Sequence, residues 1–384
     1  MIKYLKYFVS SLLLILALLL CFNGKHYPTF FFLGFSLFII MGDIFLGKDT
    51  SIEKYKYPVL INLPIYLNLS LLLILVMAVI FIFGNQNPEW FVNIFSVYLN
   101  IDLLYAKSSV NLADKISLVA ITSLYVGVMG TVPGHELTHR KRSKIDMFFG
   151  NWLLALSWDC AFAIEHVYGH HKNVGLSSDP ATAKRGENIY AFIIKAMIVE
   201  QRDAWKIEFD HLYRRGQKPF GVHNRMIIGY LRSLMITMIA FIIGGVNGMF
   251  CFLLCALLAK SFLEAINYTE HYGLVRERGK PVRMRHSWNS NHLLSSLYLC
   301  NVTRHSDHHR TSTLKFWELN PCDDSAPTLP YGYLGMLYLL LIAPFMYQKL
   351  MAKKLIDWDL NYANAEERKL ASIQNVSSRI IDIK

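Results

Sequence analysis

The stretch ISLVAITSLYVGVMGTVPGHELTH, residues 116–139, joins an apolar run to two histidines that are four positions apart, His135 and His139. A helix needs about 20 mostly apolar residues to cross the hydrocarbon core of a membrane. Positions i and i+4 lie on one face of a helix, so both imidazoles can bind the same metal ion. The stretch therefore predicts a transmembrane helix that ends in metal ligands.

The whole chain has the composition of an integral membrane protein. Of its 384 residues, 53% are hydrophobic and only 17% are charged, which is more apolar and less charged than soluble domains. Stretches that are long and apolar enough to span a bilayer lie at about residues 4–22, 28–46, 58–83, 116–133, 226–244 and 246–263. We therefore expect an all-α membrane protein with about six transmembrane helices. Residues 1–359 are expected to form the membrane-embedded domain, and residues 360–384 a polar C-terminal tail.

Positive charge orients the predicted spans. The segment from Pro133 to Arg225 holds 14 of the 39 Lys and Arg residues, and cytoplasmic loops carry such an excess. This bias predicts that both termini and the histidine clusters face the cytoplasmic side of the inner membrane. It also accounts for the net charge of +11 without nucleic-acid binding. The apolar stretch from Tyr331 to Tyr347 is followed by three lysines, so it is expected to be a buried or interfacial helix.

Nine of the fourteen histidines fall into four clusters, each beside an apolar stretch. The clustered residues are His135, His139, His166, His170, His171, His271, His305, His308 and His309. Spacings of three and four residues predict that each cluster presents its imidazoles on one helical face. A structural zinc ion takes four ligands at most, so nine imidazoles predict two metals of higher coordination number.

Acidic residues adjoin these clusters, namely Glu136, Glu165, Glu270 and Asp307. A carboxylate that accepts a hydrogen bond from the outer nitrogen of a ligating imidazole fixes its tautomer and orientation, and we expect these four to do so. The six cysteines are scattered without a CxxC pair, which argues against a cysteine metal site or a disulfide framework. Lys260 and Glu264, four positions apart within a predicted span, are expected to pair with each other.

Other interpretations of the histidines are weaker. The HExxH pattern occurs in zinc proteases, with Glu136 as the general base, but the Leu-Asp-Gly ligand motif of membrane zinc proteases is absent from the sequence. A metal transporter or non-catalytic metal-binding protein would usually hold its ions near the membrane midplane. A single histidine at a membrane interface is usually a hydrogen-bonded polar group without a metal. That role is assigned to His26, His211, His223, His286 and His292, of which His292 is a candidate neighbour of the site.

Five motifs occur in a fixed order: HELTH, EHVYGHH, NYTEHYGL, HSWNSNH and RHSDHH. In these motifs the chain resembles the integral-membrane alkane 1-monooxygenase (alkane hydroxylase) family, from about Gly42 to Tyr333. That family is a branch of the membrane non-haem di-iron desaturases and hydroxylases. The resemblance implies that the nine clustered histidines bind two iron ions and that O2 is a co-substrate. The chain departs from the family pattern at Lys172–Pro180 and Leu314–Trp317, which leaves the exact substrate and the electron-donor contact open.

The resemblance implies hydroxylation of the terminal methyl group of an alkane or a similar apolar chain. A fatty-acyl or aromatic-methyl hydroxylase, or a desaturase, is the alternative within the same superfamily. Because the sequence has no GxGxxG or CxxC signature, electrons are expected from a rubredoxin or ferredoxin with its NAD(P)H-dependent reductase. A cytoplasmic basic cluster could steer an acidic donor, and it consists of Arg140, Lys141, Arg142, Lys144, Arg214, Arg215 and Lys218.

An apolar substrate is expected to reach the site from the bilayer. Phe31, Phe35 and Phe38 form a helical stripe in the second predicted span. Such a stripe is more often ordinary packing or lipid contact than the lining of a channel. Both interpretations stay open at the level of sequence.

Overall fold

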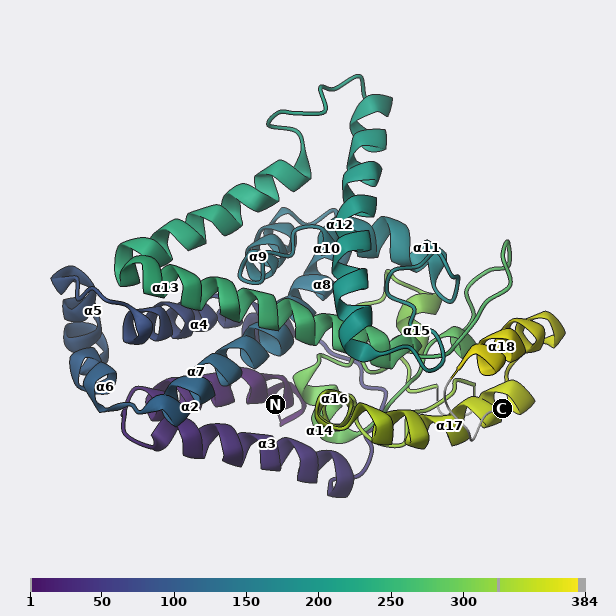
Figure 1. Ribbon diagram of the computed structural model, residues 1–384, viewed down its shortest axis with the longest axis horizontal. Helices are drawn as coiled ribbons and strands as arrows, with labels where there is room; N and C mark the ends of the chain where they lie inside the picture. The colour runs from purple at the N-terminus through teal and green to yellow at the C-terminus, as the bar shows by residue number, and fades with distance from the viewer. Residues whose placement is uncertain (1, 323–324, 379–384) are drawn as a thin grey trace.

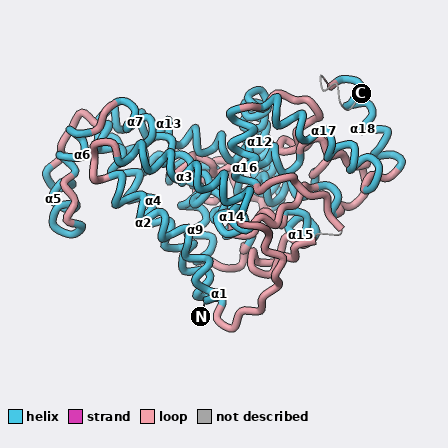
Figure 2. The backbone as a smooth tube through the Cα atoms, turned by 90° about the horizontal axis from the view of Figure 1, so that it is seen from below, coloured by secondary structure: helices cyan, strands magenta, loops and turns pink. Residues whose placement is uncertain are grey.

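The computed structural model describes residues 2–322 and 325–378 and is built of helices, with no β-strand among these residues (Figures 1 and 2). The first half contains α1 (Ile2–Leu5), η1 (Lys6–Phe8), α2 (Val9–Cys21), α3 (Tyr27–Phe45), α4 (Pro58–Phe83), α5 (Glu89–Leu99), α6 (Leu103–Ser109), α7 (Leu112–Tyr125), η2 (Val126–Thr131), α8 (Val132–His139), α9 (Lys144–Ala155), α10 (Phe162–Glu165), η3 (His166–His170) and α11 (His171–Asn173). The second half contains α12 (Ile189–Arg214), α13 (Arg225–His271), η4 (Met284–His286), α14 (Leu293–Tyr298), α15 (His305–Arg310), α16 (Tyr333–Ile342), α17 (Pro344–Asn361) and α18 (Ala365–Ser377). Two of these segments, η2 and η3, are π-helical.

Among the described residues, five helices are long and apolar enough to cross a membrane, at Lys3–Cys21, Tyr27–Phe45, Pro58–Phe83, Leu112–His139 and Arg225–His271. The first four match the first four predicted spans. The last helix, α13, contains both remaining predicted spans, because its 47 residues are bent at Gly245, which has φ 63° and ψ −158°. Figure 1 shows α13 as a hairpin of two arms. About six transmembrane helices were predicted, and the structure has five candidate spans, because one helix contains two of the predicted stretches.

The bend in α13 packs against the end of α4. A Cβ atom added to Gly84 would lie 2.5 Å from the Cα atom of Gly244, so only glycine permits this contact. The Asn85 amide donates a hydrogen bond to the Gly244 carbonyl (3.1 Å). Gly245 itself adopts a positive φ, which a side chain would strain. The glycines therefore fix where the two arms of α13 meet α4.

One continuous helix runs through the middle of the bundle, formed by α7, η2 and α8. It is the most enclosed of the five candidate spans. In its 18-residue apolar segment 89% of the residues are buried, whereas the figure for α3 is 33%. Its last residue is His139, and α13 ends at His271. In both views α5 and α6 lie at one end of the molecule and α17 and α18 at the other (Figures 1 and 2). From the end that carries α5 and α6, this middle helix and the second arm of α13 run inward to His139 and His271 (Figure 1).

The apolar stretch at 331–347 is not one long helix. Residues Tyr333–Ile342 form α16, Ala343 leaves the helical conformation, and α17 begins at Pro344, as expected because a residue before proline avoids the α region. Ten helical residues rise about 15 Å, about half of the hydrocarbon core. The helix α16 packs on α3 and α13, as expected for a buried helix and not a seventh span.

Candidate metal centre

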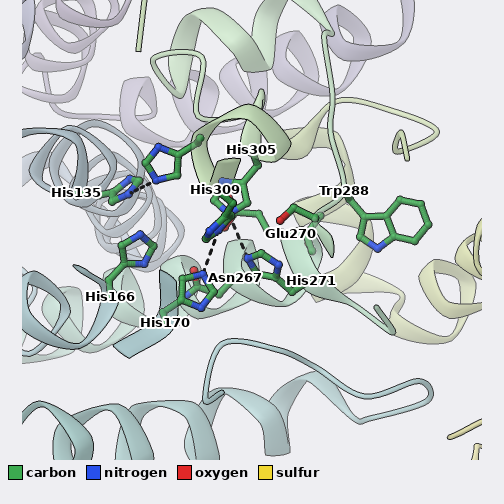
Figure 3. A network of polar contacts seen from close by, with 12 residues as sticks. His135, His166, His170, Asn267, Glu270, His271, Trp288, His305 and His309 are labelled. Carbon is green, nitrogen blue, oxygen red and sulfur yellow. Dashed lines mark hydrogen bonds and ion pairs between the residues drawn. The ribbon is translucent and has the colours of Figure 1, made fainter. Parts of the chain in front are cut away.

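Four parts of the chain bring the nine clustered histidines together. Figure 3 labels His135, His166, His170, His271, His305 and His309. The helix α8 supplies two, the segment η3 with the first residue of α11 supplies three, the end of α13 supplies one, and α15 supplies three. Seven of the nine are buried, and His139 and His171 are partly exposed. All four predicted clusters therefore meet in one place, although up to 174 positions separate their members along the sequence.

The nine imidazoles divide into two groups that could each hold a metal ion. Group A consists of His135, His139, His166, His171 and His308. Group B consists of His170, His271, His305 and His309. Within each group the ligand nitrogens lie within 4.8 Å of one another. The structure thus supports the predicted pair of metal sites and divides the ligands five to four between them.

A π-helical turn explains how the second cluster serves both groups. In a π-helix the backbone hydrogen bonds join residues five positions apart and not four, and residues His166–His170 adopt this conformation. His166 and His171, five positions apart, therefore align, and their Nε2 atoms are 3.1 Å apart. His170 is released to the other group. The prediction that spacings of four place this cluster on one face is wrong here, because the extra residue in the turn changes the register.

The third cluster is also divided. His305 and His309 share one face of α15, with their Nε2 atoms 2.8 Å apart in group B, as the i, i+4 spacing predicts. His308 instead turns to group A, where its Nε2 atom lies 3.1 Å from that of His135. The expectation that all three share one face is therefore wrong, because α15 is wedged between the groups and presents a different side to each.

The separations of the nitrogens fit bound metal ions. Neighbouring Nε2 atoms are 2.8 to 3.3 Å apart in both groups. Metal–nitrogen bonds of about 2.0–2.1 Å that meet at right angles place two nitrogens about 2.9 Å apart. Burial lowers the pKa of His308 to about 3, and burial also lowers the pKa of His309. These imidazoles are therefore neutral, which is the form that binds metals.

The orienting hydrogen bonds come from unexpected partners. The Nδ1 atom of His170 lies 3.0 Å from Asp179 Oδ2, and Nδ1 of His271 lies 3.2 Å from the backbone carbonyl oxygen of His286. Each contact uses the outer nitrogen and leaves Nε2 for the metal. Sequence reasoning assigned neither partner, since Asp179 lies nine residues after its histidine and His286 acts through its backbone.

The four predicted acidic residues lie beside the groups but make other contacts in the described structure. Glu136 accepts hydrogen bonds from Arg140 (2.7 Å) and from the Phe316 amide (3.3 Å). Asp307 accepts hydrogen bonds from the amide and side chain of Asn320 (2.8 and 3.0 Å). These two buried carboxylates therefore hold the surrounding chain and do not contact an outer imidazole nitrogen.

Glu165 lies against the glycine of the second motif, and Glu270 contacts a histidine of group B. A Cβ atom on Gly169 would lie 2.2 Å from Glu165 Oε1, so the glycine of the second motif leaves room for this carboxylate. Glu270 Oε2 lies 3.3 Å from His305 Nε2, which is the inner nitrogen, and Figure 3 shows Glu270 beside His271 and Trp288. Glu270 therefore borders group B itself and does not support a ligand from behind.

A network of charges lies behind the metal groups. The Lys260 ammonium is 2.8 Å from Asp159 Oδ2, 2.5 Å from Glu200 Oε2 and 2.6 Å from Glu264 Oε1. The expected pair of Lys260 and Glu264 is confirmed, and two carboxylates from outside the predicted spans complete it. Lys260 also lies 5.4 Å from the ring centre of Phe162, which stacks on His166. All four charged residues are buried.

The aromatic stripe of the second span is divided between the interior and the surface. Phe31 and Phe35 are buried, whereas Phe38 is 45% exposed. Phe35 packs against Tyr125 and Tyr298, with ring centres 5.2 and 5.9 Å apart. These three rings border a narrow cavity of about 10 Å³, which is room for about one water molecule. Phe38 is therefore at the outer surface, and only Phe35 of the stripe borders the cavity.

Two of the five remaining histidines, His286 and His292, are buried. His292 contacts the Ser290 hydroxyl (2.9 Å) and belongs to neither group. The His286 side chain contacts Glu367 (2.8 Å). Both keep the predicted role of hydrogen-bonded polar groups, but the backbone of His286 also reaches a candidate ligand.

Comparison with known proteins agrees with this geometry. A family model described as fatty acid desaturase matches residues 115–340, which include all nine clustered histidines. This chain belongs to the fatty acid desaturase family. The chain is 39% identical to alkane 1-monooxygenase 1 of Pseudomonas aeruginosa over 229 residues. This alignment covers 57% of this chain and 58% of that protein. It is 34% identical over 253 residues to alkane 1-monooxygenase 2 of Alcanivorax borkumensis, which covers 65% of each.

These two alignments span less than two thirds of the relatives' length. A longer alignment joins the chain to the hydroxylase component of a xylene/toluene monooxygenase from Pseudomonas putida. It is 30% identical over 363 residues and covers 92% of this chain and 90% of that protein. The resemblance inferred from the five motifs is confirmed, since several relatives in this family are alkane 1-monooxygenases.

Proposed function

We propose that this chain is a membrane monooxygenase that hydroxylates the terminal methyl group of an alkane or a similar apolar chain, using O2 and two electrons. The observation that carries the proposal is the pair of adjoining groups made only of imidazoles, at the ends of two helices that can cross a membrane. Relatives named alkane 1-monooxygenase support the same reaction.

We take iron as the metal of both groups, because activation of O2 needs an ion that changes its oxidation state, which zinc does not. Group A offers five imidazoles, which is more than the four ligands of a structural zinc site, and imidazole ligands suit iron. A bound pair of irons supplies the redox capacity to activate O2. The chain contributes the nine ligands, the orienting contacts to His170 and His271, and a buried setting that excludes water.

We propose that the substrate reaches this centre from the bilayer, along the surface where Phe35, Tyr125 and Tyr298 meet. The cavity there is too narrow for a hydrocarbon chain as it stands, so at least one of these rings has to turn to admit a substrate. Its lining comes from α3, α7, η2, α14 and α16. Of the two α3 residues in the lining, Phe35 and Ile39, Phe35 has the larger exposed fraction, 7% against 1%.

The methyl group of an arene is the second candidate substrate. The relative that aligns with most of this chain is the hydroxylase component of a xylene/toluene monooxygenase. Aromatic rings border the narrow cavity, and flat rings pack well against one another. A compact methylarene would also need less room than a long alkane.

The electron donor is proposed to be a separate rubredoxin or ferredoxin with its reductase, docking on the cytoplasmic side. His139 and His171 are the partly exposed members of the metal groups. Beside them Tyr168 is 43% exposed, with the Lys141 ammonium 3.9 Å and the Arg225 guanidinium 5.3 Å from its ring centre. We call Tyr168, Lys141 and Arg225 the collar. The collar is a better docking candidate for an acidic protein than the whole predicted basic cluster.

Arg140, a member of the predicted basic cluster, forms an ion pair with the buried carboxylate of Glu136. We expect Lys141→Gln to raise the KM for the donor at low ionic strength and to leave the KM for the hydrocarbon unchanged, because only docking is weakened. The matched control is Lys115→Gln, because Lys115 lies at the start of the continuous helix Leu112–His139, at the opposite end from His139. Equal donor kinetics in wild type and Lys141→Gln would remove the collar from the proposal.

The reaction is tested by product identification. Membranes that contain the protein receive NADH, a rubredoxin and its reductase, 18O2, and in turn an n-alkane, a methylarene and a fatty acid. A primary alcohol that carries 18O from the alkane supports the first proposal, and a benzylic alcohol as the dominant product supports the second. Metal uptake without any oxygenated product would instead favour a metal-binding or transport protein.

A further inference from the structure

The C-terminal helices lie against the loop that supports a ligand of group B. The side chain of Trp358, in α17, donates a hydrogen bond to the Arg285 carbonyl (2.6 Å). Arg185 donates hydrogen bonds to Asp359 (2.6 and 2.7 Å) and to the Gly273 carbonyl (2.9 Å). Gly273 is two residues beyond His271. The end of α13 and the loop after it are therefore held by the C-terminal part of the chain.

Glu367, in the first turn of α18, is the centre of this contact. Its side chain is fully buried. Oε1 accepts hydrogen bonds from His286 Nε2 (2.8 Å) and from Arg285 (3.1 Å). Oε2 accepts hydrogen bonds from Arg285 Nε (2.8 Å) and from the Asn364 amide (3.0 Å). A carboxylate with four donors fixes the position of each donor, since burial makes an unmade hydrogen bond costly.

The His286 ring is fixed on both sides. Its Nδ1 atom accepts a hydrogen bond from the Arg283 amide (3.0 Å), so Nε2 carries the proton that is donated to Glu367. With both ring nitrogens engaged, the ring cannot turn without breaking a buried hydrogen bond. The η4 turn at Met284–His286 is therefore held in place by Glu367.

The backbone of this turn reaches the metal centre. The His286 carbonyl oxygen lies 3.2 Å from His271 Nδ1, and His271 Nε2 faces His305 Nε2 at 3.2 Å. A hydrogen bond to the outer nitrogen sets the tautomer and orientation of a ligating histidine. The next residues are fixed too, because the Trp288 amide donates to the Glu270 carbonyl (2.8 Å). Figure 3 shows Glu270, His271 and Trp288 side by side.

We propose that Glu367 is a positioning residue for group B, which orients His271 through the His286 ring and carbonyl. The proposal rests on the proposed function only in that group B holds a metal. Glu367 lies beyond residues 115–340, the segment that the family model matches. The other anchored histidine of group B, His170, donates its hydrogen bond from Nδ1 to Asp179, which lies inside that segment. The support for His271 is therefore an addition from the C-terminal part of the chain.

The test measures metal affinity in the full-length protein, purified in detergent and reloaded with Fe(II). Loss of a partner that supports a ligand weakens metal binding by about 10- to 100-fold, so Glu367→Ala should raise the dissociation constant of one of the two irons by that factor. Glu367→Gln keeps the volume and should fall between Ala and wild type. The matched control is Glu366→Gln, because Glu366 is exposed and contacts Lys369 on the same helix.

A Mössbauer spectrum of the 57Fe-loaded protein adds a readout that general destabilisation does not change. The signal of one iron should change in Glu367→Gln while the other keeps its wild-type parameters. If both irons keep wild-type affinity and spectra while only the melting temperature falls, α18 merely stabilises the fold and the proposal is wrong. If wild type binds two irons but gives no oxygenated product, the proposed reaction fails while this inference stands.

Discussion

Lys260 offers a sharp test of the buried charge network. Its ammonium faces Asp159, Glu200 and Glu264 at 2.5 to 2.8 Å, and all four side chains are buried. Replacing Lys260 with Met keeps the length and most of the volume but leaves three carboxyl groups without a cation. Because burial penalises unpaired charge, we expect a large loss of stability.

The size of the loss follows from the loss of one partner in a buried ion pair, which costs about 3–5 kcal/mol. An unfolding entropy of about 2.1 cal/mol/K per residue over 384 residues is roughly 0.8 kcal/mol/K. The melting temperature of Lys260→Met should therefore fall by roughly 4–6 °C. Adding Glu264→Gln should recover part of this loss, since it removes one of the surplus carboxylates.

The assay is thermal denaturation in detergent, followed by fluorescence-detected size-exclusion chromatography. The matched control is Lys195→Met, because the Lys195 side chain is 41% exposed and pairs with Glu187. An exposed pair contributes about 0–1 kcal/mol, so this variant should melt within about 1 °C of wild type. Equal shifts in the two variants would refute the reasoning.

The effect of Lys260→Met should also depend on pH. Burial raises the pKa of Asp159 and of Glu200, and Lys260 opposes that rise. When folding raises the pKa of a carboxyl group, the folded protein becomes less stable as the pH increases through that pKa. Without the lysine these groups bind protons more readily, so the deficit of the variant should shrink at mildly acidic pH and grow at alkaline pH. A deficit that is constant with pH would contradict this account.

Three further outcomes are expected. Purified protein should hold about two irons, and His139→Ala should lower this content, whereas the control His292→Ala should keep it, as measured by ICP mass spectrometry. Phe35→Ala should admit bulkier hydrocarbons, because it widens the cavity, while Phe38→Ala should leave the product profile unchanged. If gas chromatography gives identical product profiles for the two variants, both rings serve packing only. Although burial alone would raise it, hydrogen bonds from His286 and Arg285 lower the pKa of Glu367 to about 2. The anchoring of α18 should therefore be present above about pH 4.5 and be lost as the pH falls toward 2. This loss should appear as faster hydrogen exchange in α18, and Glu367→Gln should abolish its dependence on pH.

The long apolar helices and the histidines that gather in two groups could be predicted from the sequence, because each has a strong local signal. Apolar length predicts a span, and clustered histidines beside a span predict ligands. The division of the ligands between two groups could not be predicted. It depends on the π-helical turn at His166–His170, and the residue types in that turn do not distinguish a repeat of five from a repeat of four.

The supporting contacts were missed for a different reason. Asp179 and Glu367 act across distances in sequence that spacing rules do not cover, and His286 acts through its backbone carbonyl. Adjacency in sequence instead drew attention to Glu136 and Asp307, whose carboxylates contact Arg140 and Asn320. On a helix, the neighbour of a ligand points away from the ligand's face, which is why adjacency is a poor guide to such contacts.

The π-helical turn also couples the two groups mechanically. It delivers His170 to one group and its immediate neighbour His171 to the other, and α15 does the same with His309 and His308. A shift or rotation of either short helix must therefore move ligands at both groups at once. If metal ions bind in both groups, their ligand positions would therefore be linked. A change of coordination in one group would shift ligands of the other.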